Sequence, residues 1–277
     1  MKIGNIKELR KVSSEVRLKV LDVVYKTPGG HIGGSYSVID ILVVLYYNIM
    51  KHDPKNSGWI DRDYLILSKG HCCLALYAVL EKTGYFNETF LQSYCHNGGL
   101  LGGHPKKGDA PGIEATTGSL GHGLSIGCGI ALAHKISTKT NRIFVIMGDG
   151  EMNEGSVWEG LMFASQQKLN NLTIVIDNNR LESLDLTNNI LSIEPLEERL
   201  TSFGWNVARV DGHNHGELCK SLSTLFNTQD KPVAIIADTT KGKGVSFMEN
   251  VPMWHHRKLK DDEYKNAKLE LEQDRRI

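Results

Sequence analysis

Apolar residues recur at helical spacing in the first part of the chain. Six of them fall three or four positions apart within residues 5–25: Ile6, Leu9, Val12, Val16, Val20 and Val24. This period predicts a helix there, which Thr27-Pro28-Gly29-Gly30 ends. A glycine-rich loop, GGHIGGS, is expected next, and an apolar helix from about Val38 to Met50 follows it.

A short apolar run and a long glycine-rich stretch come after these helices. Residues 64–67 (YLIL) predict a buried strand that leads into SKGHCC and a helix near 74–82. Residues 95–123 are dense in glycine and carry His96, His104 and His122. We interpret them as a functional loop system, because a flexible linker has no need of several imidazoles.

The second half alternates strand and helix patterns with short turns. Strands are predicted at 143–147, 172–177, 206–210 and 233–238, and helices at about 123–138, 154–168, 195–203 and 215–227. This alternation is typical of an α/β fold, a doubly wound and mostly parallel sheet flanked by helices. We expect one domain over residues 1–277, with a charged, solvated helical tail from about Arg257.

Composition narrows the function classes. The 277 residues include 32 basic and 32 acidic side chains, which argues against a nucleic-acid footprint or a polybasic membrane patch. The longest apolar run, residues 39–47, contains Asp40 and falls short of the roughly 18–20 residues of a membrane span. The N-terminus lacks the apolar stretch of a signal peptide. Five cysteines, two of them adjacent, suggest reduced thiols and a cytoplasmic location.

The sharpest motif is IFVIMGDGEMNEG, followed further on by TIVIDNNRLE. A strand that ends in Gly148-Asp149-Gly150 puts a carboxylate at the carboxyl edge of a parallel sheet, where ligands bind in this architecture. The glycines let backbone N–H groups approach a phosphate, and Asn178-Asn179 closes the next strand. Carboxylate, amide and backbone oxygens suit Mg²⁺ or Ca²⁺. The Gly-Asp-Gly triplet alone would more often be a turn. Together with Asn178-Asn179 at the end of the next strand, it predicts a site for a cation and a diphosphate.

This spacing of GDG and NN is the thiamine-diphosphate binding motif, and the chain around it resembles the N-terminal, diphosphate-binding half of a transketolase. The matching segments run along nearly the whole chain: GGHIGGS, SKGH, GGHP, EATTGSLGHG, GDGEMNEG, DNNR, TTKGKG and WHH. The histidine-bearing loops point to transketolase among the enzymes that use this cofactor. The resemblance implies the thiamine-diphosphate-binding fold (PP-type domain), thiamine diphosphate, and Mg²⁺, for which Ca²⁺ or Mn²⁺ can substitute.

The resemblance also assigns roles to residues around the motif. It implies that Asp149, Asn179 and the main-chain carbonyl of Leu181 hold Mg²⁺. Gly148 and Gly150 would lie against the diphosphate.

Three further residues match positions close to the cofactor. Gly118 and Leu120 correspond to residues near its aminopyrimidine ring. Glu154 corresponds to a buried acid that couples two cofactor sites across the subunit interface.

The resemblance makes several histidines catalytic. His31, His71 and His104 match residues that line the transketolase active site, bind sugar hydroxyls and assist proton transfers. His255, in the WHH segment, matches a further active-site histidine. The family commonly has WHG there, so His256 departs from its pattern.

Other polar residues are interpreted more plainly. Four histidines are taken as ordinary surface or core residues: His52, His134, His213 and His215. The roles of His96 and His122 stay open. Lys241 and Lys243 in TTKGKG fit a solvated loop and a phosphate contact equally well.

Part of a transketolase has no counterpart in this sequence. The resemblance implies a pyrimidine-binding domain with a cofactor-activating glutamate and with arginines for the sugar phosphate, and neither set is visible here. We therefore expect a split enzyme whose N-terminal subunit works with a separate C-terminal subunit, in the form of an α₂β₂ assembly. It would transfer a two-carbon ketol unit from a ketose phosphate to an aldose phosphate, and the isolated chain would have negligible activity.

Five alternatives remain. The narrowest is a transketolase that acts on an unusual branched or deoxy sugar phosphate, which the partner subunit would decide. The chain could be an expressed fragment of a longer protein. It also resembles deoxyxylulose-phosphate synthase, although that enzyme is usually one longer chain. The α subunit of a 2-oxo-acid dehydrogenase is similar too, but normally lacks these histidine loops. From a different class, the chain could be a non-catalytic module that keeps the cofactor fold.

Overall fold

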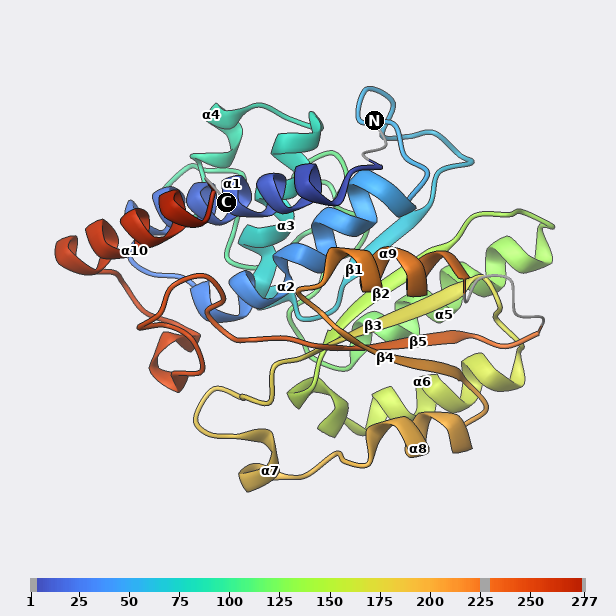
Figure 1. Cartoon of the computed structure of the whole chain (residues 1–277). Coiled ribbons are helices and arrows are strands. Elements are labelled where there is room, and N and C mark those ends of the chain that lie inside the picture. The colour runs from blue at the N-terminus through green and yellow to red at the C-terminus, as the bar shows by residue number, and fades with distance from the viewer. Residues whose placement is uncertain (1–3, 225–229, 276–277) are drawn as a thin grey trace.

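A five-stranded parallel sheet forms the centre of the computed structural model, which describes residues 4–224 and 230–275 (Figure 1). The strands lie in the order β1-β2-β3-β5-β4. Their bounds are β1 Tyr64–Leu67, β2 Ile143–Gly148, β3 Leu172–Asn178, β4 Asn206–Asp211 and β5 Val233–Asp238. This sheet confirms the predicted fold class.

Helices cover both faces of the sheet (Figure 1). One layer contains α1 Ile6–Tyr25, α2 Ile32–Val44, α3 Cys73–Thr83, α9 His215–Thr224 and α10 Asp261–Asp274; the other contains α5 His122–Ile136, α6 Gly155–Gln166 and α8 Leu196–Ser202. Successive strand residues serve opposite layers: Val175 packs with the first layer, while Ile174 and Ile176 pack with the second. Strands buried on both faces read as unbroken apolar runs, which is why the sequence pattern located them.

The strand order follows from the handedness of the connections. The chain passes from β1 to β4 across the sheet with α5, α6 and α8 on one face. It then returns through α9 on the opposite face and inserts β5 between β3 and β4. A return on the opposite face keeps every parallel crossover right-handed.

Two predictions about the second helix are corrected. The segment GGHIGGS is not all loop, because α2 begins at Ile32 and includes Gly33 and Gly34 in its first turn. The helix therefore begins well before the predicted start at Val38, and a five-residue π-helix, Leu45–Ile49, continues it close to the predicted end at Met50. Both pieces lie in the core, where tertiary packing outweighs the weak helix propensity of glycine.

The same helix also corrects the expectation that no segment has the length of a membrane span. Residues 32–49 are long and apolar enough by length and composition, but 94% of that window is buried inside the fold. A core helix surrounded by protein on all sides has this composition.

The charged C-terminal segment is helical, as predicted, but not solvated all round. Helix α10 packs along α1 (Figure 1), burying Ala267 and Leu271. Tyr264 stacks on Tyr25 with ring centres 4.1 Å apart. Only the outer face of this helix is therefore exposed.

Short elements complete the chain. They are η2 Gly70–Cys72, α4 Glu88–Leu91, η3 Gly150–Asn153, α7 Thr187–Ile190 and η5 Pro252–His255. The sequence pattern predicted none of these short elements. The end of the helix predicted over 215–227 lies outside the described residues.

Candidate active site

The carboxyl ends of four neighbouring strands meet at one edge of the sheet. Residues 68–71 follow β1, Gly148-Asp149-Gly150 closes β2, Asn178-Asn179 closes β3, and residues 239–241 follow β5. Parallel strands point the same way, so these segments border one crevice, as α/β ligand sites do. A cavity of about 420 Å³ opens there.

Every predicted site residue except His104 lines this cavity. These residues are His31, His71, Gly118, Leu120, Gly148, Asp149, Gly150, Glu154, Asn179, Leu181 and His255. His104 is exposed, but its ring centre lies 6.1 Å from that of His31. The fold thus brings together residues that are spread over more than two hundred positions of the sequence.

The Asp149 carboxylate is fixed by the turn that follows β3. One oxygen accepts a hydrogen bond from the Gly150 N–H at 2.9 Å. The other accepts from the Arg180 N–H at 2.5 Å and from the Thr187 hydroxyl at 3.1 Å. Burial, and then the nearby Asp177 carboxylate, raises the pKa of Asp149 to about 6.

Asn179, Leu181 and Lys241 form a second group beside this carboxylate. The Asn179 side-chain oxygen accepts from the Leu181 N–H at 3.1 Å. Lys241 Nζ donates to the carbonyls of Leu181 at 3.1 Å and Glu182 at 2.8 Å, and lies 3.1 Å from His255 Nδ1. Burial, followed by the charge of Lys69, lowers the pKa of Lys241 to about 8.

These groups fit a divalent cation that is shared with a diphosphate. Asp149, Asn179 and the Leu181 carbonyl offer hard oxygen ligands. Within the described part of the chain, no group of three histidine, cysteine or acidic side chains could hold a metal ion by itself, so oxygens of a bound molecule must complete the shell. Space for that molecule is left at Gly148, where an added Cβ would meet only the Lys69 side chain, at 3.9 Å.

Four histidines gather around His31. Its ring centre is 5.2 Å from those of His71 and His255, and 4.5 Å from that of His256. His104 is the fifth member. We call these residues the histidine cluster; its members come from the start of α2, from η2, from the loop before α5 and from the end of η5.

The inner members of the histidine cluster are uncharged at neutral pH. Burial, and then the neighbouring imidazoles, lowers the pKa of His31 to about 3. Burial and Lys241 lower the pKa of His255 to about 4, and burial and Lys69 hold that of His71 well below its ordinary value. Each neutral imidazole therefore has one N–H donor and one acceptor nitrogen, and in His255 the Nδ1 nitrogen is taken by Lys241.

Glycines at the start of α2 allow a segment from the C-terminal part of the chain to pack closely against it. Residues 252–258, which we call the strap, carry His255 and His256. The backbones of Gly30 and Arg257 form a two-way bridge with both N···O distances at 3.3 Å. A Cβ on Gly33 would lie 2.7 Å from the Trp254 carbonyl, so only glycine allows this approach. The same holds at Gly118, where φ is +143° and an added Cβ would lie 2.7 Å from the His104 ring.

Two charged residues of the site were missed by the sequence analysis. Lys69, in SKGH, is 2% exposed and forms an ion pair with the fully buried Asp177 at 2.5 Å. Burial would lower the pKa of Lys69, but Asp177 more than offsets this and raises it above its ordinary value. A lysine directly before a glycine–histidine pair is a signal that could have been followed, because lysine is a common phosphate ligand.

Glu151, directly after the glycine–aspartate triplet, is the second. Its buried carboxylate accepts hydrogen bonds from Gly121 N–H at 2.8 Å, from Gly148 N–H at 3.2 Å and from the Ser68 hydroxyl. Burial raises its pKa. By contrast, Glu154 lines the cavity but is exposed, so the buried acid expected there is not buried in the single chain.

Of the four residues left open by the sequence, Lys241 lines this cavity and the other three do not. His96 is exposed, and His122 is the exposed first residue of α5 rather than a loop residue. Lys243 lines two other cavities.

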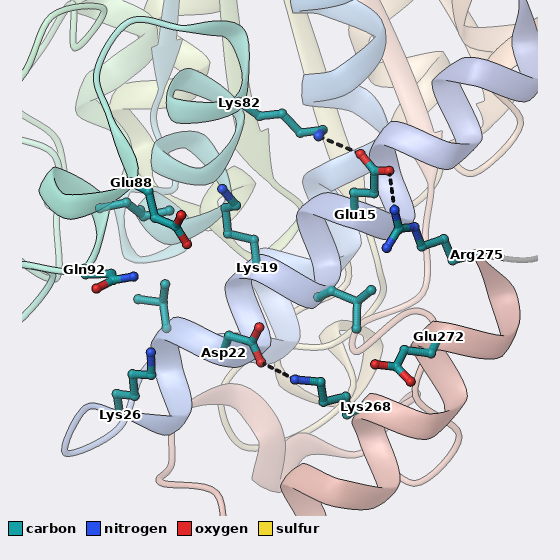
Figure 2. A pocket seen from close by; sticks show the side chains of 13 residues that line it. Glu15, Lys19, Asp22, Lys26, Lys82, Glu88, Gln92, Lys268, Glu272 and Arg275 are labelled. Carbon is teal, nitrogen blue, oxygen red and sulfur yellow. Dashed lines mark hydrogen bonds and ion pairs between the residues drawn. The ribbon is translucent and has the colours of Figure 1, made fainter.

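Another hollow, between α1, α3, α4 and α10, is lined by charges that pair with one another (Figure 2). Glu15 meets Lys82 at 2.6 Å and Arg275 at 3.0 Å, and Lys268 meets Asp22 at 3.3 Å. We assign this hollow no part in the chemistry, because these pairs neutralise one another.

Comparison with known proteins agrees with this geometry. Residues 9–276 match the family described as "Transketolase, thiamine diphosphate binding domain". The fold is that of a thiamine-diphosphate-binding domain. The chain belongs to the transketolase family, which confirms the resemblance read from its motifs.

Two similar relatives are about as long as this chain, and both are named as parts of divided enzymes. One, from the apulose-4-phosphate transketolase of Phocaeicola vulgatus, is 39% identical over 266 residues, which cover 96% of this chain and 94% of that one. The other, from the 6-deoxy-6-sulfo-D-fructose transketolase of a Clostridium species, is 40% identical over 267 residues, covering 96% and 97%.

Solved structures match only in part of their length. A transketolase from Campylobacter jejuni superposes with a TM-score of 0.92 at 31% identity, covering 99% of this chain but 44% of that one. Transketolase from Leishmania mexicana gives 0.89 at 27% identity, covering 99% and 42%. The chain therefore spans less than half the length of these transketolases.

Proposed function

We propose that this chain is the N-terminal subunit of a two-subunit transketolase. With thiamine diphosphate and Mg²⁺ it would transfer a two-carbon ketol unit from a ketose phosphate to an aldose phosphate. The observation that carries this proposal is the meeting, in one cavity, of the oxygen ligands Asp149, Asn179 and Leu181 with the histidine cluster. Cation site and sugar-binding imidazoles are both needed for this transfer, and neither alone would suggest it.

The cation and the diphosphate have an obvious place at the strand ends. Asp149, Asn179 and the Leu181 carbonyl would hold Mg²⁺, and the backbone at Gly148 and Gly150 would lie against the diphosphate. When bound, the cofactor supplies the nucleophilic carbon and the electron sink for breaking and making the C–C bond. The protein has to orient, protonate and shield the reacting groups.

The histidine cluster suits the proton-handling part of this work. Its inner imidazoles are neutral, so an N–H of His31 or His71 can donate to a sugar carbonyl or hydroxyl oxygen while a bare ring nitrogen accepts a proton. His255 is oriented by Lys241 on its Nδ1 side, which leaves Nε2 for a ligand. His104, being exposed, would meet the part of the sugar that lies further out.

An uncovered apolar face supports a partner subunit. Helix α5 exposes Ile126 and Ile136, and the neighbouring α6 exposes Met162 and Phe163. We propose that a C-terminal subunit carrying the pyrimidine-binding domain covers this face in an α₂β₂ assembly. Glu154, at the start of α6, would become buried there. The names of the two relatives of similar length, each given as one subunit of a transketolase, support a divided enzyme.

The natural sugar pair is a finer question. Relatives of similar length are named for apulose 4-phosphate and for 6-deoxy-6-sulfofructose. We propose a sugar donor of this kind, with an acidic group at the end distant from the carbonyl.

A reducing cytoplasm would suit the five free cysteines.

The test is a ketol-transfer assay with xylulose 5-phosphate and ribose 5-phosphate, thiamine diphosphate and Mg²⁺. It compares the purified chain with the chain plus the polypeptides that co-purify with it from its native source. Activity in the mixture alone is expected. Turnover by the rigorously purified chain would overturn the proposed division of labour.

A second readout separates cofactor binding from catalysis. Calorimetry should detect binding of thiamine diphosphate with Mg²⁺, abolished in Asp149→Ala. Binding without turnover of any sugar phosphate, even with the partner, would favour the non-catalytic module instead.

A further inference from the structure

A separate cavity of about 370 Å³ lies between α1, the start of α9, the end of α10 and the loop after β5. None of its lining residues has a place in the candidate active site. They are Lys7, Arg10, Lys11, Ser13, Ser14, Arg17, Asp40, His213, His215, Lys243, Asp274 and Arg275.

The wall is strongly cationic, although the chain as a whole carries no formal net charge. It holds six lysines and arginines against two carboxylates. Lys7, Arg10 and Lys11 stand exposed along one side of α1 and take part in none of the ion pairs between described residues. Glu15, which feels the charge of Lys11, is already paired with Lys82 at 2.6 Å and Arg275 at 3.0 Å.

The floor is a buried network around Asp40, which is 2% exposed. One Asp40 oxygen accepts from Arg17 Nη2 at 2.5 Å and lies 2.7 Å from His213 Nδ1. His215 Nε2 is 2.9 Å from the Ser13 hydroxyl and 3.4 Å from the other Asp40 oxygen, without hydrogen-bond geometry to the latter. These side chains are too deep to be an ordinary solvated surface.

Three buried polar atoms of this floor lack a partner. Within the described residues, Arg17 Nε, Asp40 Oδ1 and His215 Nδ1 make no hydrogen bond. Buried polar groups are nearly always satisfied, so a cluster of unsatisfied ones marks a place where water or a ligand belongs. Donors and one acceptor occur side by side here, which suits a ligand that has both acceptor oxygens and hydroxyl groups.

We propose that this cavity binds a small phosphate monoester that also carries hydroxyl groups. Its phosphate would lie against Lys7, Arg10 and Lys11, where charge-assisted hydrogen bonds are available. A hydroxyl would donate to Asp40 Oδ1, and other ligand oxygens would accept from the Arg17 guanidinium. The exposed cations of the wall and the paired Asp40 carboxylate of the floor together favour an anion that also carries hydroxyl groups.

The site is joined to the active-site cavity by the loop after β5. His213 Nε2 accepts from the Thr240 N–H at 2.8 Å, and the adjacent Lys241 reaches the Leu181 carbonyl. A ligand that orders His213 and Lys243 would therefore restrain the loop that supplies Lys241. This step rests on the proposed function. The ligand should act as an effector that changes the affinity of the chain for the cofactor, and the cofactor should change the affinity for the ligand by the same factor.

The experiment uses isothermal titration calorimetry on the full chain saturated with thiamine diphosphate and Mg²⁺, so that the cofactor cradle is filled. The probes are glycerol 3-phosphate, inorganic phosphate and glycerol. The variant Lys7→Ala/Arg10→Ala removes two exposed cations of the site. The control Lys55→Ala/Lys265→Ala removes two exposed cations elsewhere and matches it in net charge.

Saturable binding of glycerol 3-phosphate is expected, at least tenfold weaker in Lys7→Ala/Arg10→Ala and changed less than twofold in the control. Inorganic phosphate should bind more weakly and glycerol not at all. Equal binding by the site variant and the wild type would overturn the site, and equal binding of phosphate and glycerol 3-phosphate would overturn the role of Asp40. None of these readouts needs catalysis, so failure here is distinct from failure of the proposed function.

Discussion

At the scale of single residues, the histidine cluster is unusual because no carboxylate of the described residues makes a hydrogen bond to any of its rings. His31 is surrounded by other imidazoles and by Lys241, all of which disfavour a second positive charge. The cost of protonation keeps these rings neutral and available both as donors and as acceptors. It also makes the fold sensitive to acid.

We expect acid to destabilise the chain partly through His31. The unfolded residue takes up a proton near pH 6.5, but the folded one does so only near pH 3. Between these values the unfolded state binds more protons, so the free energy of unfolding falls as the pH is lowered from 6.5. From pH 7 to pH 5 the wild type should lose about 1 kcal/mol more than His31→Gln, allowing for partial solvent screening.

Urea unfolding of the cofactor-free chain at both pH values measures this difference. His122→Gln, which changes an exposed ring at the start of α5, should follow the wild type. Parallel losses in wild type and His31→Gln would contradict the assignment.

The Lys69–Asp177 pair should be far more important for stability than a surface pair. Lys69→Met leaves the Asp177 carboxylate buried beside the Ser37 hydroxyl without its cation. We expect a loss of about 3–5 kcal/mol in the free energy of unfolding. The matched change Lys139→Met breaks a largely exposed pair with Asp61 and should cost less than about 1 kcal/mol.

Denaturant unfolding of both variants gives the comparison. Adding Asp177→Asn to Lys69→Met should recover part of the loss, because it removes the uncompensated charge. Equal small losses in the two lysine variants would show that solvent reaches Asp177.

Sequence reasoning found the residues whose motif is distinctive and missed those whose role depends on packing. The flanking glycines and the family pattern singled out His31, His71 and Asp149. Glutamate and lysine usually lie in solvent, and only the folded chain reveals that Glu151 and Lys69 are buried. Burial is a property of what packs above a residue, which a local pattern does not contain.

At the scale of elements, the strap is held by close backbone contacts that only glycine allows. Gly29 and Gly30 meet the backbone of Arg257, and Gly33 meets that of Trp254. The glycine-rich segment is therefore a docking surface for another part of the main chain as well as the start of a helix. This is why a loop was predicted where α2 begins: the glycines serve close contact, not flexibility.

Gly33→Ala should displace the strap. The added Cβ would come within 2.7 Å of the Trp254 carbonyl, so the backbone must move, at a cost of about 1–3 kcal/mol. Trypsin should then cleave after Lys258 faster than in the wild type. The control Gly129→Ala lies in α5, where an added Cβ meets nothing within 4 Å, and should stabilise the chain by up to about 1 kcal/mol. Unchanged cleavage in Gly33→Ala would show that the strap does not depend on this contact.

At the scale of the whole molecule, the two helical layers differ in how completely they are covered. The layer with α1 and α10 closes on itself, whereas α5 and α6 leave large apolar side chains in solvent. An apolar surface of this kind marks an interaction site. The sheet order was beyond prediction, because the sequence pattern does not say on which face of the sheet each connection runs.

Met162→Glu together with Phe163→Glu should block assembly with the C-terminal subunit and spare the fold of the chain. Both side chains are more than 40% exposed, so the chain alone should keep its circular dichroism and its cofactor binding. Size-exclusion chromatography of the mixture should show at least tenfold weaker association. Leu269→Glu, equally exposed on α10, should assemble normally. Normal assembly of the α6 variant would move the interface elsewhere.

The insertion of β5 between β3 and β4 has a consequence for the chain as it leaves the ribosome. Both neighbours of β5 are complete once Asp211 has been made, but the strand that joins them is not. Until β5 has been made, one edge of β3 is unpaired and can pair with other strands. Because β5 also leads to Lys241 and the strap, the same stretch of chain completes both the sheet and the histidine cluster, and a nascent chain that has not reached β5 lacks both.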